Sequence, residues 1–251
     1  MNALEVSVAR KAYGTDVGEL VAIEGLAFSV PAGQFACILG PSGCGKTTLL
    51  SLVAGLDRDY EGSIRRSGRQ LGMVFQTPRL MPWLTARENV RLALDPPPRA
   101  PGRAEGILAE MQLAPYLDAF PRQLSGGQQR RVALARAFVR DPDLLLLDEP
   151  FLSLDAPTAQ HLRGLLLALW VRRRPTILFV THDLREALSL GDRVLFLTAG
   201  PARLALDLAL DLVRPRHPDD AAIEAMRARL LQSHPDLLRG LAAAGSAESA
   251  A

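Results

Sequence analysis

A glycine-rich loop carries the clearest chemistry in the sequence. Residues 40–47 read Gly-Pro-Ser-Gly-Cys-Gly-Lys-Thr and fit the pattern G-x-x-x-x-G-K-[ST]. The apolar run at 35–39 predicts a buried strand before the loop, and 46–54 predicts a helix after it, stopped by Gly55. Between a strand and a helix, the backbone N–H groups of such a loop converge on a phosphate at the positive end of the helix. The loop therefore predicts a site for the phosphates of a nucleotide.

Two side chains of the loop have predicted roles of their own. The ammonium of Lys46 is expected to reach the β and γ phosphates as a point charge, and the hydroxyl of Thr47 is expected to bind Mg²⁺. Lysine is rare here, since Lys11 and Lys46 are the only two against many arginines. A lysine in such a chain suggests a place where a compact, flexible cation works and a planar guanidinium would not.

Two adjacent carboxylates follow a second apolar run. The four leucines at 144–147 predict a buried strand, and Asp148 and Glu149 stand at its end. Asp148 is expected to hold Mg²⁺ through its waters, and Glu149 is expected to act as the base for an attacking water. The alternative is an acidic pair on the solvated surface, which the four leucines disfavour.

A second glycine-rich segment stands before another predicted helix. Residues 124–128 read Leu-Ser-Gly-Gly-Gln and precede a helix expected at 127–139, with Ser125 as its N-cap. The segment has no lysine and lies outside the alternating strands and helices, so it is not expected to hold a nucleotide alone. One consistent explanation is that it caps the γ-phosphate of a nucleotide bound to a second copy of the protein. The alternative is a simple Ser-capped helix start.

Hydrophobic patterning predicts the elements that position these residues. Short apolar stretches predict paired strands at 4–9 and 20–30, and helices in the middle of the chain flank a proline-rich connector. From residue 144 onward strands and helices alternate, which is typical of a parallel sheet with crossover helices. The remaining predicted elements are strands at 64, 71–75, 144–147, 176–180 and 193–197, helices at 85–93, 103–113, 157–171, 184–190 and 219–232, and the connector at 95–102.

Composition excludes several classes of protein. The chain has 251 residues, 48% of them hydrophobic, and 29 basic against 27 acidic residues leave a formal net charge of +2, which argues against a nucleic-acid-binding surface. No apolar run approaches the roughly 18 residues of a membrane span, and no secretory signal is visible, so a cytosolic location is expected. Cys37 and Cys44 are too few for a disulfide framework or a metal knuckle and are expected to be small buried or loop residues.

The motifs together resemble those of the nucleotide-binding subunit of ATP-binding-cassette (ABC) transporters, over about residues 4–239. Residues 40–48 resemble the Walker A motif, residues 124–128 the family signature and residues 144–149 the Walker B motif, all in the family's order. The resemblance implies an α/β fold: a P-loop NTPase (RecA-like) core with an antiparallel β subdomain. It also implies an inserted α-helical subdomain at about 77–141. Residues 240–251 are expected to form a disordered tail.

Single residues extend the resemblance. Gln76 matches the Q-loop glutamine, Asp155 the D-loop aspartate and His182 the switch histidine, while Tyr13 matches the aromatic position on which adenine stacks. The resemblance implies that Glu149 polarises the attacking water, that His182 contacts the γ-phosphate, and that Gln76 joins Mg²⁺ to the region touching a membrane partner. The implied ligands are ATP and Mg²⁺. The implied ATP contacts are Tyr13, Gly40, Pro41, Ser42, Gly43, Cys44, Gly45, Lys46, Thr47, Thr48, Gln76, Ser125, Gly126, Gly127, Gln128, Asp155 and His182; the metal ligands are Thr47, Gln76 and Asp148; the catalytic residues are Glu149, His182 and Lys46.

The resemblance also implies partners. Two copies would pack head to tail with two ATP molecules between them, each held by the Walker A motif of one copy and the signature of the other. Transmembrane permease subunits would be the direct partners at the cytoplasmic face of the inner membrane, and a periplasmic or extracellular solute-binding protein an indirect one. Nucleic acid is not an expected partner.

One segment points to an import group. Pro82-Trp83, and the late Arg214-Pro-Arg216, are similar to ATPases that serve nitrate, sulfonate and taurine import, although relatives importing pyrimidine precursors and aromatic acids look much alike. Side chains after the Q-loop could line a groove for a short permease helix, or they could pack inside the helical subdomain. These side chains are Leu80, Met81, Trp83 and Leu84.

Two other functions remain open alternatives. The first is a soluble ABC ATPase acting on nucleic acid or ribosomes; such relatives carry two cassettes in one chain or a long coiled coil, and this sequence shows neither. The second is a small-molecule kinase on the same core. A kinase needs neither the signature pentapeptide nor a water base at Glu149, so the sequence favours an ATPase.

Overall fold

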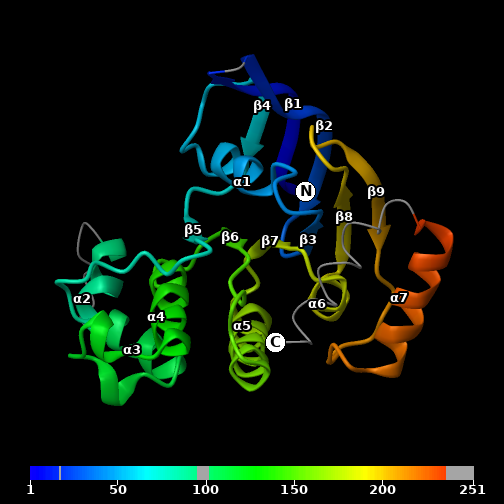
Figure 1. Cartoon of the computed structure of the whole chain (residues 1–251). Helices are drawn as coiled ribbons and strands as arrows, with labels where there is room; N and C mark the ends of the chain where they lie inside the picture. The colour runs from blue at the N-terminus through cyan, green and yellow to red at the C-terminus, as the bar shows by residue number, and fades with distance from the viewer. Residues whose placement is uncertain (17, 95–101, 236–251) are drawn as a thin grey trace. The chain divides into compact units, whose positions relative to one another are not determined.

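The computed structural model describes residues 1–16, 18–94 and 102–235 (Figure 1). The chain forms two compact units, the first from Met1–Ser67 with Thr176–Ala251 and the second from Gly68–Pro175. The predicted tail at 240–251, and all but the last residue of the predicted connector at 95–102, lie outside the described residues. The 77–141 boundaries of the helical subdomain stay a prediction.

An antiparallel sheet opens the first unit. Its strands β1 (Asn2–Thr15), β2 (Gly18–Pro31) and β4 (Glu61–Arg66) pair in the order β2-β1-β4. Leu4, Val6 and Val8 of β1 are buried and alternate with exposed neighbours, which is the pattern of a sheet with one covered face. The predicted strand pair at 4–9 and 20–30 is confirmed, and β1 continues well beyond its predicted end.

The first unit also contains the buried strand that leads into the glycine-rich loop. Every residue of β3 (Phe35–Leu39) is buried, and the parallel strands β7 (Thr176–Thr181) and β8 (Arg193–Leu197) flank it. Such near-continuous apolar strands are typical of parallel sheets covered on both faces. The antiparallel strand β9 (Leu204–Ala209) pairs with β8 and was not predicted from the sequence.

Three helices complete the described part of the first unit: α1 (Lys46–Ala54), α6 (Leu184–Leu190) and α7 (Ala221–Ser233). The bounds of α1 and α6 are those predicted. Gly55 ends α1 in the left-handed region at φ 76°, a common helix stop. Helix α6 packs against β3 and α7.

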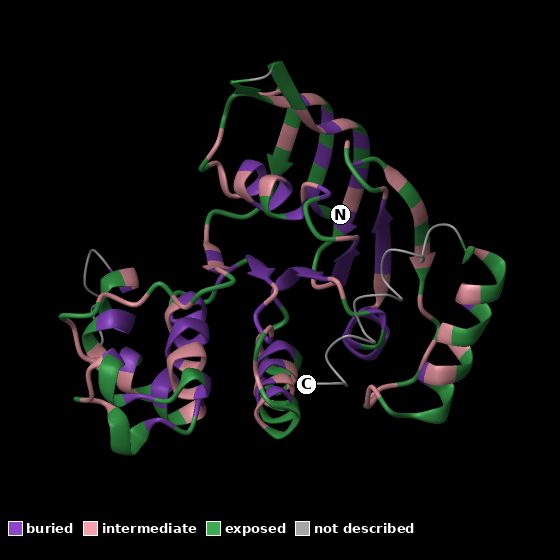
Figure 2. Cartoon of the chain, in the orientation of Figure 1, coloured by how far each residue is buried: buried purple, intermediate pink, exposed green. Residues whose placement is uncertain are grey.

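The second unit combines two parallel strands with helices. Strands β5 (Leu71–Val74) and β6 (Leu144–Asp148) pair in parallel. Helix α4 (Gly126–Phe138) packs against α2 (Ala86–Arg91), α3 (Arg103–Glu110), α5 (Ala156–Arg173) and β5. Short 3-10 turns lie at η1 (Leu92–Leu94), η2 (Ala114–Tyr116) and η3 (Pro121–Gln123). Many residues of α4 and every residue of β6 are buried (Figure 2).

Helix α2 begins with a complete capping box. The side chain of Thr85 accepts from the backbone N–H of Glu88 at 3.3 Å, and the carboxylate of Glu88 accepts from the backbone N–H of Thr85 at 2.8 Å. This reciprocal pair satisfies two backbone donors that the first turn of a helix leaves without a helical partner.

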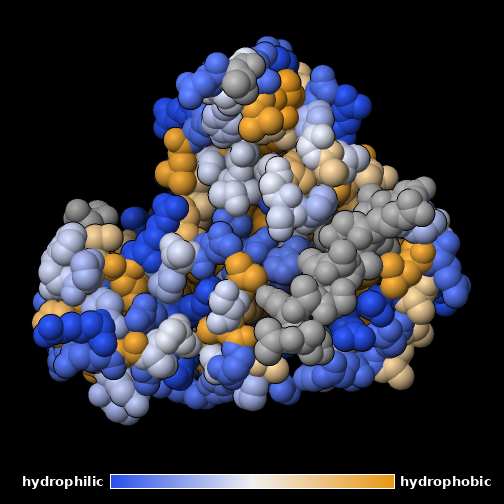
Figure 3. All heavy atoms as spheres, viewed as in Figure 1, coloured by the Kyte–Doolittle hydropathy of each residue, from blue (hydrophilic) through white to orange (hydrophobic). Residues whose placement is uncertain are grey.

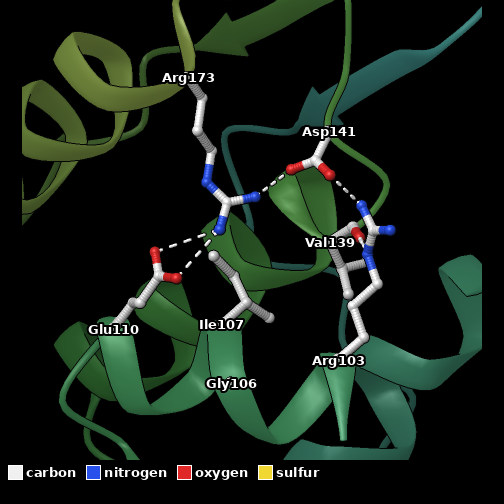
Figure 4. A pocket seen from close by; sticks show the side chains of 7 residues that line it. All are labelled: Arg103, Gly106, Ile107, Glu110, Val139, Asp141 and Arg173. Carbon is white, nitrogen blue, oxygen red and sulfur yellow. Dashed lines mark hydrogen bonds and ion pairs between the residues drawn. The ribbon is translucent and has the colours of Figure 1, made fainter. Parts of the chain in front are cut away.

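A chain of ion pairs joins three helices within the second unit (Figure 4). Arg103 and Arg173 both bind Asp141, and Arg173 also binds Glu110 at 3.0 Å. These side chains line a cavity of about 310 Å³. Two guanidinium groups face two carboxylates, so the cavity walls carry balanced charge. We therefore interpret this cluster as a clamp between α3 and the ends of α4 and α5.

No helix among the described residues is long and apolar enough to cross a membrane. On the face shown in Figure 3, hydrophobic groups outside the grey residues are small and interspersed with hydrophilic ones. Cys37 and Cys44 are both buried thiols, as expected for small interior residues. Burial raises the pKa of the Cys37 thiol well above its usual value.

Candidate functional site: a nucleotide-binding loop and its partner motifs

The loop between β3 and α1 requires its glycines. Gly43 and Gly45 have φ of 76° and 106°, a left-handed region that side chains disfavour. A Cβ on Gly45 would lie 2.8 Å from the backbone oxygen of Ala22, and one on Gly40 would lie 2.7 Å from Cys44 Sγ. The backbone is therefore packed too tightly for larger residues at two of the three positions, and it turns sharply into α1.

The start of α1 presents positive charge. Gly45 is the N-cap and provides no side-chain hydrogen bond, and the first turn contains no acidic residue. The helix dipole therefore acts at this end without an acidic residue in the helix's own first turn to offset it. The Lys46 side chain is buried, and its Nζ donates to Gly40 O at 2.8 Å and to Pro41 O at 2.9 Å. The ammonium thus lies against the loop that carries it.

The other residues in and next to the loop differ in burial. Cys44 is buried behind the loop. Ser42 and Thr47 are exposed, while Pro41 and Thr48 are half-buried. Thr47 is therefore an exposed residue of the first turn of α1, where an oxygen ligand for a hard cation is expected.

Tyr13 is held from two sides at the end of β1. Lys11 Nζ lies 4.4 Å from the centre of its ring, and its hydroxyl donates to Asp57 Oδ2 at 3.3 Å. Lys11 is only 3% exposed and also pairs with Asp57 at 3.0 Å, while the Tyr13 residue is 38% exposed. The hydrogen bond from Lys11 lowers the pKa of the Asp57 carboxyl. The ring is thus fixed and still accessible to a planar ligand.

His182 lies in a turn that is pinned on both sides. Thr181, at the end of β7, donates its hydroxyl to Glu186 Oε2 at 2.6 Å and accepts from the backbone N–H of Asp183 at 3.1 Å. The Asp183 carboxylate accepts from the backbone N–H of Arg185 at 2.8 Å at the start of α6. The half-buried His182 is therefore carried by a rigid segment.

The first unit brings the loop and His182 to one sheet edge. In the parallel pair β3 and β7, Leu39 lies opposite Thr181. The residues that follow both strands, Gly40 and His182, therefore emerge at the same carboxyl edge, which is where ligands bind in open parallel sheets. Within the first unit, the loop and His182 are therefore brought to the same edge of the sheet.

Asp148 is the last residue of the buried strand β6 in the second unit, and Glu149 follows it. Asp148 is only 4% exposed, so the predicted burial of this carboxylate is observed. Glu149 is half-buried with φ 42°, and its carbonyl accepts from the backbone N–H of Leu152 at 3.2 Å. A left-handed backbone at a residue with a side chain costs roughly 1–3 kcal/mol and is common at functional sites.

The second glycine-rich segment starts α4 with its own cap. Ser125 Oγ accepts from the backbone N–H of Gln128 at 3.3 Å, and Gln128 Oε1 accepts from the backbone N–H of Ser125 at 2.7 Å. Ser125 and Gly126 are exposed, Gly127 is buried and Gln128 is half-buried. The predicted N-cap is confirmed. A serine hydroxyl that accepts one hydrogen bond can still donate its own proton to another oxygen.

Gln76 and Asp155 lie on loops of the same unit. Val74 of β5 lies opposite Leu147 of β6, so Gln76 and Glu149 stand two residues beyond paired positions at one sheet edge. The exposed carboxylate of Asp155 caps α5 and accepts from the backbone N–H of Thr158 at 2.9 Å. That hydrogen bond lowers the pKa of Asp155. Within the second unit, Gln76 and Glu149 are therefore brought together, while Asp155 has a structural partner.

Sequence reasoning missed two residues that hold the site. Lys11 stood out as one of two lysines, yet nothing in the sequence showed that it lies beneath Tyr13. Arg130 on α4 donates to the backbone oxygens of Gln76 and Pro150, and no motif marks such contacts. Both roles depend on residues that are far apart in the chain, so only the tertiary structure shows them.

Comparison with known proteins gives a consistent result. The ABC transporter family profile matches residues 23–152. The chain is 43% identical, over 92% of its length and 86% of the relative's, to an aliphatic sulfonates import ATP-binding protein of Burkholderia cenocepacia. It is 38% identical to a protein of the same name from Bacillus subtilis, over 91% of this chain and 93% of that one.

A solved structure matches the fold. The fold is similar, with a TM-score of 0.75 and 30% identity, to a dimeric ATP-binding cassette in a post-hydrolysis state bound to ADP and Pi. The match covers 84% of this chain and all of that one. The predicted α/β class and P-loop NTPase architecture are therefore confirmed.

Proposed function

The chain belongs to the ABC transporter family and is an ATPase, and from that premise we propose that it is the energy-coupling subunit of an importer for aliphatic sulfonates. The similarity to sulfonate import ATP-binding proteins over nearly the whole chain carries this proposal. The sequence also resembles ATPases that serve the import of nitrate, taurine and related small solutes. These solutes are the alternatives to aliphatic sulfonates that the test must distinguish.

We assign the phosphates of ATP to the loop before α1. The uncapped start of α1 and the tight turn at its glycines support this assignment. Tyr13, with its accessible ring, is the proposed support for adenine. Lys46 would exchange its bonds to loop carbonyls for bonds to phosphate oxygens, which are stronger because both partners are charged.

The residues assigned to Mg²⁺ suit that ion. Thr47, Gln76 and Asp148 offer a hydroxyl, an amide oxygen and a carboxylate, and Mg²⁺ prefers oxygen ligands while keeping several waters. The exposed position of Thr47 and the buried carboxylate of Asp148 support their roles. Bound Mg²⁺ would neutralise negative charge on the phosphates. Glu149 would take the proton of the attacking water, and His182 would donate a hydrogen bond to the γ-phosphate.

A rigid turn in the second unit supports docking of a permease. Asn89 is fully buried, and its side chain bonds Met81 N at 2.8 Å, Leu84 O at 3.0 Å and Thr85 O at 3.0 Å. Within this turn Trp83 is 69% exposed. Of the two explanations for the segment, internal packing therefore does not account for Trp83. An exposed aromatic ring on a fixed turn is a suitable anchor for a partner helix.

We propose that two copies close on ATP and that permease subunits hold them as a peripheral assembly at the cytoplasmic face of the inner membrane. The dimeric cassettes among the matched structures support the pairing. A solute-binding protein outside that membrane would deliver the solute. Nucleic acid is not a proposed partner, and the near-neutral charge supports this.

Co-purification and growth together test the proposal. The tagged chain should recover a multi-span permease from gently solubilised membranes. A strain lacking the gene should fail to grow on an alkanesulfonate as sole sulfur source and should still grow on sulfate. The wild-type gene should restore growth, whereas a Lys46→Ala gene should not. Recovery of ribosomes or DNA would overturn the importer function, and normal growth of the deletion strain on sulfonates would overturn the solute.

A further inference from the structure

One arginine of α4 joins two loops of the candidate site. Arg130 Nη1 donates to Gln76 O at 3.1 Å and to Pro150 O at 2.7 Å, and its Nη2 donates to Leu152 O at 2.5 Å. All three acceptors are backbone carbonyls. One guanidinium therefore fixes the backbone after β5 and the backbone after β6 at once.

The loop that Arg130 grips is strained at its first residue. Glu149 has φ 42° and Ser153 has φ 61°, and two tight turns close the loop between them. Strained backbone persists only when its surroundings hold it in place. Arg130 binds the carbonyls of Pro150 and Leu152, which are the first and third residues after Glu149. These bonds stabilise the turn that directs the carboxylate of Glu149.

The same guanidinium reaches the other residue of that sheet edge. Gln76 and Glu149 follow paired positions of parallel strands, and the bond to Gln76 O holds the first of them in register with the second. Arg130 also lies five residues after Ser125, within the first two turns of α4. It therefore connects three segments that carry proposed site residues.

We propose that Arg130 is a positioning residue for ATP hydrolysis, which holds Glu149 and Gln76 in their reactive arrangement. The inference rests on the proposed roles of those two residues. Among the described residues, the hydrogen bonds of Arg130 all go to backbone oxygens, so it acts through the residues it positions. Its planar group directs several donors at once, which a lysine ammonium on a flexible stem does less well.

The adjacent arginine provides a matched control. Arg131 also donates to two backbone carbonyls, Met111 O at 3.3 Å and Gln112 O at 3.4 Å, and burial lowers its pKa as it does that of Arg130. Its acceptors follow α3 and lie apart from the predicted site residues. Loss of Arg131 should therefore destabilise α4 without disturbing Glu149.

The test measures kcat, KM for MgATP and Tm of the purified full chain. In Arg130→Gln we expect kcat to fall about 10- to 100-fold, since small misplacements of reacting groups cost up to about 10²-fold, with KM changed less than about threefold. Arg130→Lys should be intermediate. Arg131→Gln should lose a similar amount of Tm and keep kcat within about twofold.

Wild-type kcat in Arg130→Gln would overturn the inference, and so would an equal loss of kcat in Arg131→Gln. If Arg130→Gln does not fold, Arg130→Lys decides: a lower kcat at unchanged KM supports the inference, and an unchanged kcat overturns it. ATPase activity that persists in the Lys46→Ala variant would instead contradict the proposed function.

Discussion

The helices α1 and α4 both begin at glycine-rich segments, but they differ in side-chain capping of the first backbone N–H groups. Helix α1 starts at Gly45, which has no side chain to cap it. Helix α4 starts at Ser125, whose hydroxyl forms a capping box with Gln128. The first helix start has no side-chain cap, which suits the proposed binding of an external anion, while the second has its own side-chain cap.

This difference indicates a division of labour in the proposed dimer. A loop with an uncapped helix and a lysine can hold a triphosphate alone. A self-capped helix with no lysine can add only a complementary contact, through a hydroxyl and the helix dipole. The nucleotide should therefore stay with α1 when the dimer opens, and α4 should report whether a γ-phosphate is present.

Replacing the proposed base should have the largest effect on the ATPase rate. It should also show whether α4 pairs with ATP bound to a second copy. Glu149→Gln removes the proposed base, which is typically worth about 10²–10⁴ in rate, and leaves ATP binding intact. We expect a stable ATP-bound dimer, measured by light scattering with MgATP. Monomer alone under these conditions would contradict the prediction, unless assembly requires the permease. That exception can be checked by repeating the measurement on the co-purified complex.

Replacing Lys46 should lower ATP turnover at the loop before α1. Lys46→Ala deletes a cation that would contact the transferring phosphate, and loss of one such contact typically lowers turnover about 10²–10³-fold. Steady-state ATPase assays and nucleotide titration measure the effect. Since Lys46 is buried against its loop, circular dichroism should confirm folding. Unchanged hydrolysis would refute the loop's assignment.

Replacing one glycine at each helix start should change the free energy of unfolding in opposite directions. Gly45→Ala places a Cβ 2.8 Å from a backbone oxygen at φ 106°, and such strain costs roughly 1–3 kcal/mol. Gly126→Ala meets no atom within 4 Å and should raise stability by up to about 1 kcal/mol. Denaturant titration of both variants measures the difference. Equal effects would mean that the α1 loop is not conformationally constrained.

Removal of the α4 cap should have the smallest effect on stability and a selective effect on pairing. Ser125→Ala should cost about 1 kcal/mol. Thr85→Ala, in the matching box of α2, should cost a similar amount. In a Glu149→Gln background only Ser125→Ala should weaken the ATP-dependent dimer. If both variants weaken it equally, the contribution of Ser125 is helix capping alone.

Much of the fold followed from hydrophobic patterning. The runs that became α1 and α6 each lie between residues that are glycine or aspartate, and glycine ends the run of β3, so these boundaries were clear. Strand β9 was missed because it is a half-exposed edge strand whose alternating leucine and polar or small residues resemble a loop. The extension of β1 was missed because it crosses Gly14, which usually weakens a strand.

The site was predictable where function requires local motifs. The motif residues lie at the ends of strands or helices that the sequence itself predicts. They are the loop glycines, Lys46, and the acidic pair at the end of β6. Lys11 and Arg130 could not be found this way, because their partners lie 46 and 54 residues away, at Asp57 and Gln76. Bonds to backbone carbonyls place no demand on the identity of the accepting residue, so they leave no pattern in sequence.

The scarcity of lysine makes the chain a simple subject for chemical labelling. Both lysine side chains are sheltered, Lys11 beneath Tyr13 and Lys46 within its loop. An amine-directed reagent would therefore react slowly with these two side chains. The modification rate of Lys46, followed by mass spectrometry, would report directly on the occupancy of its loop.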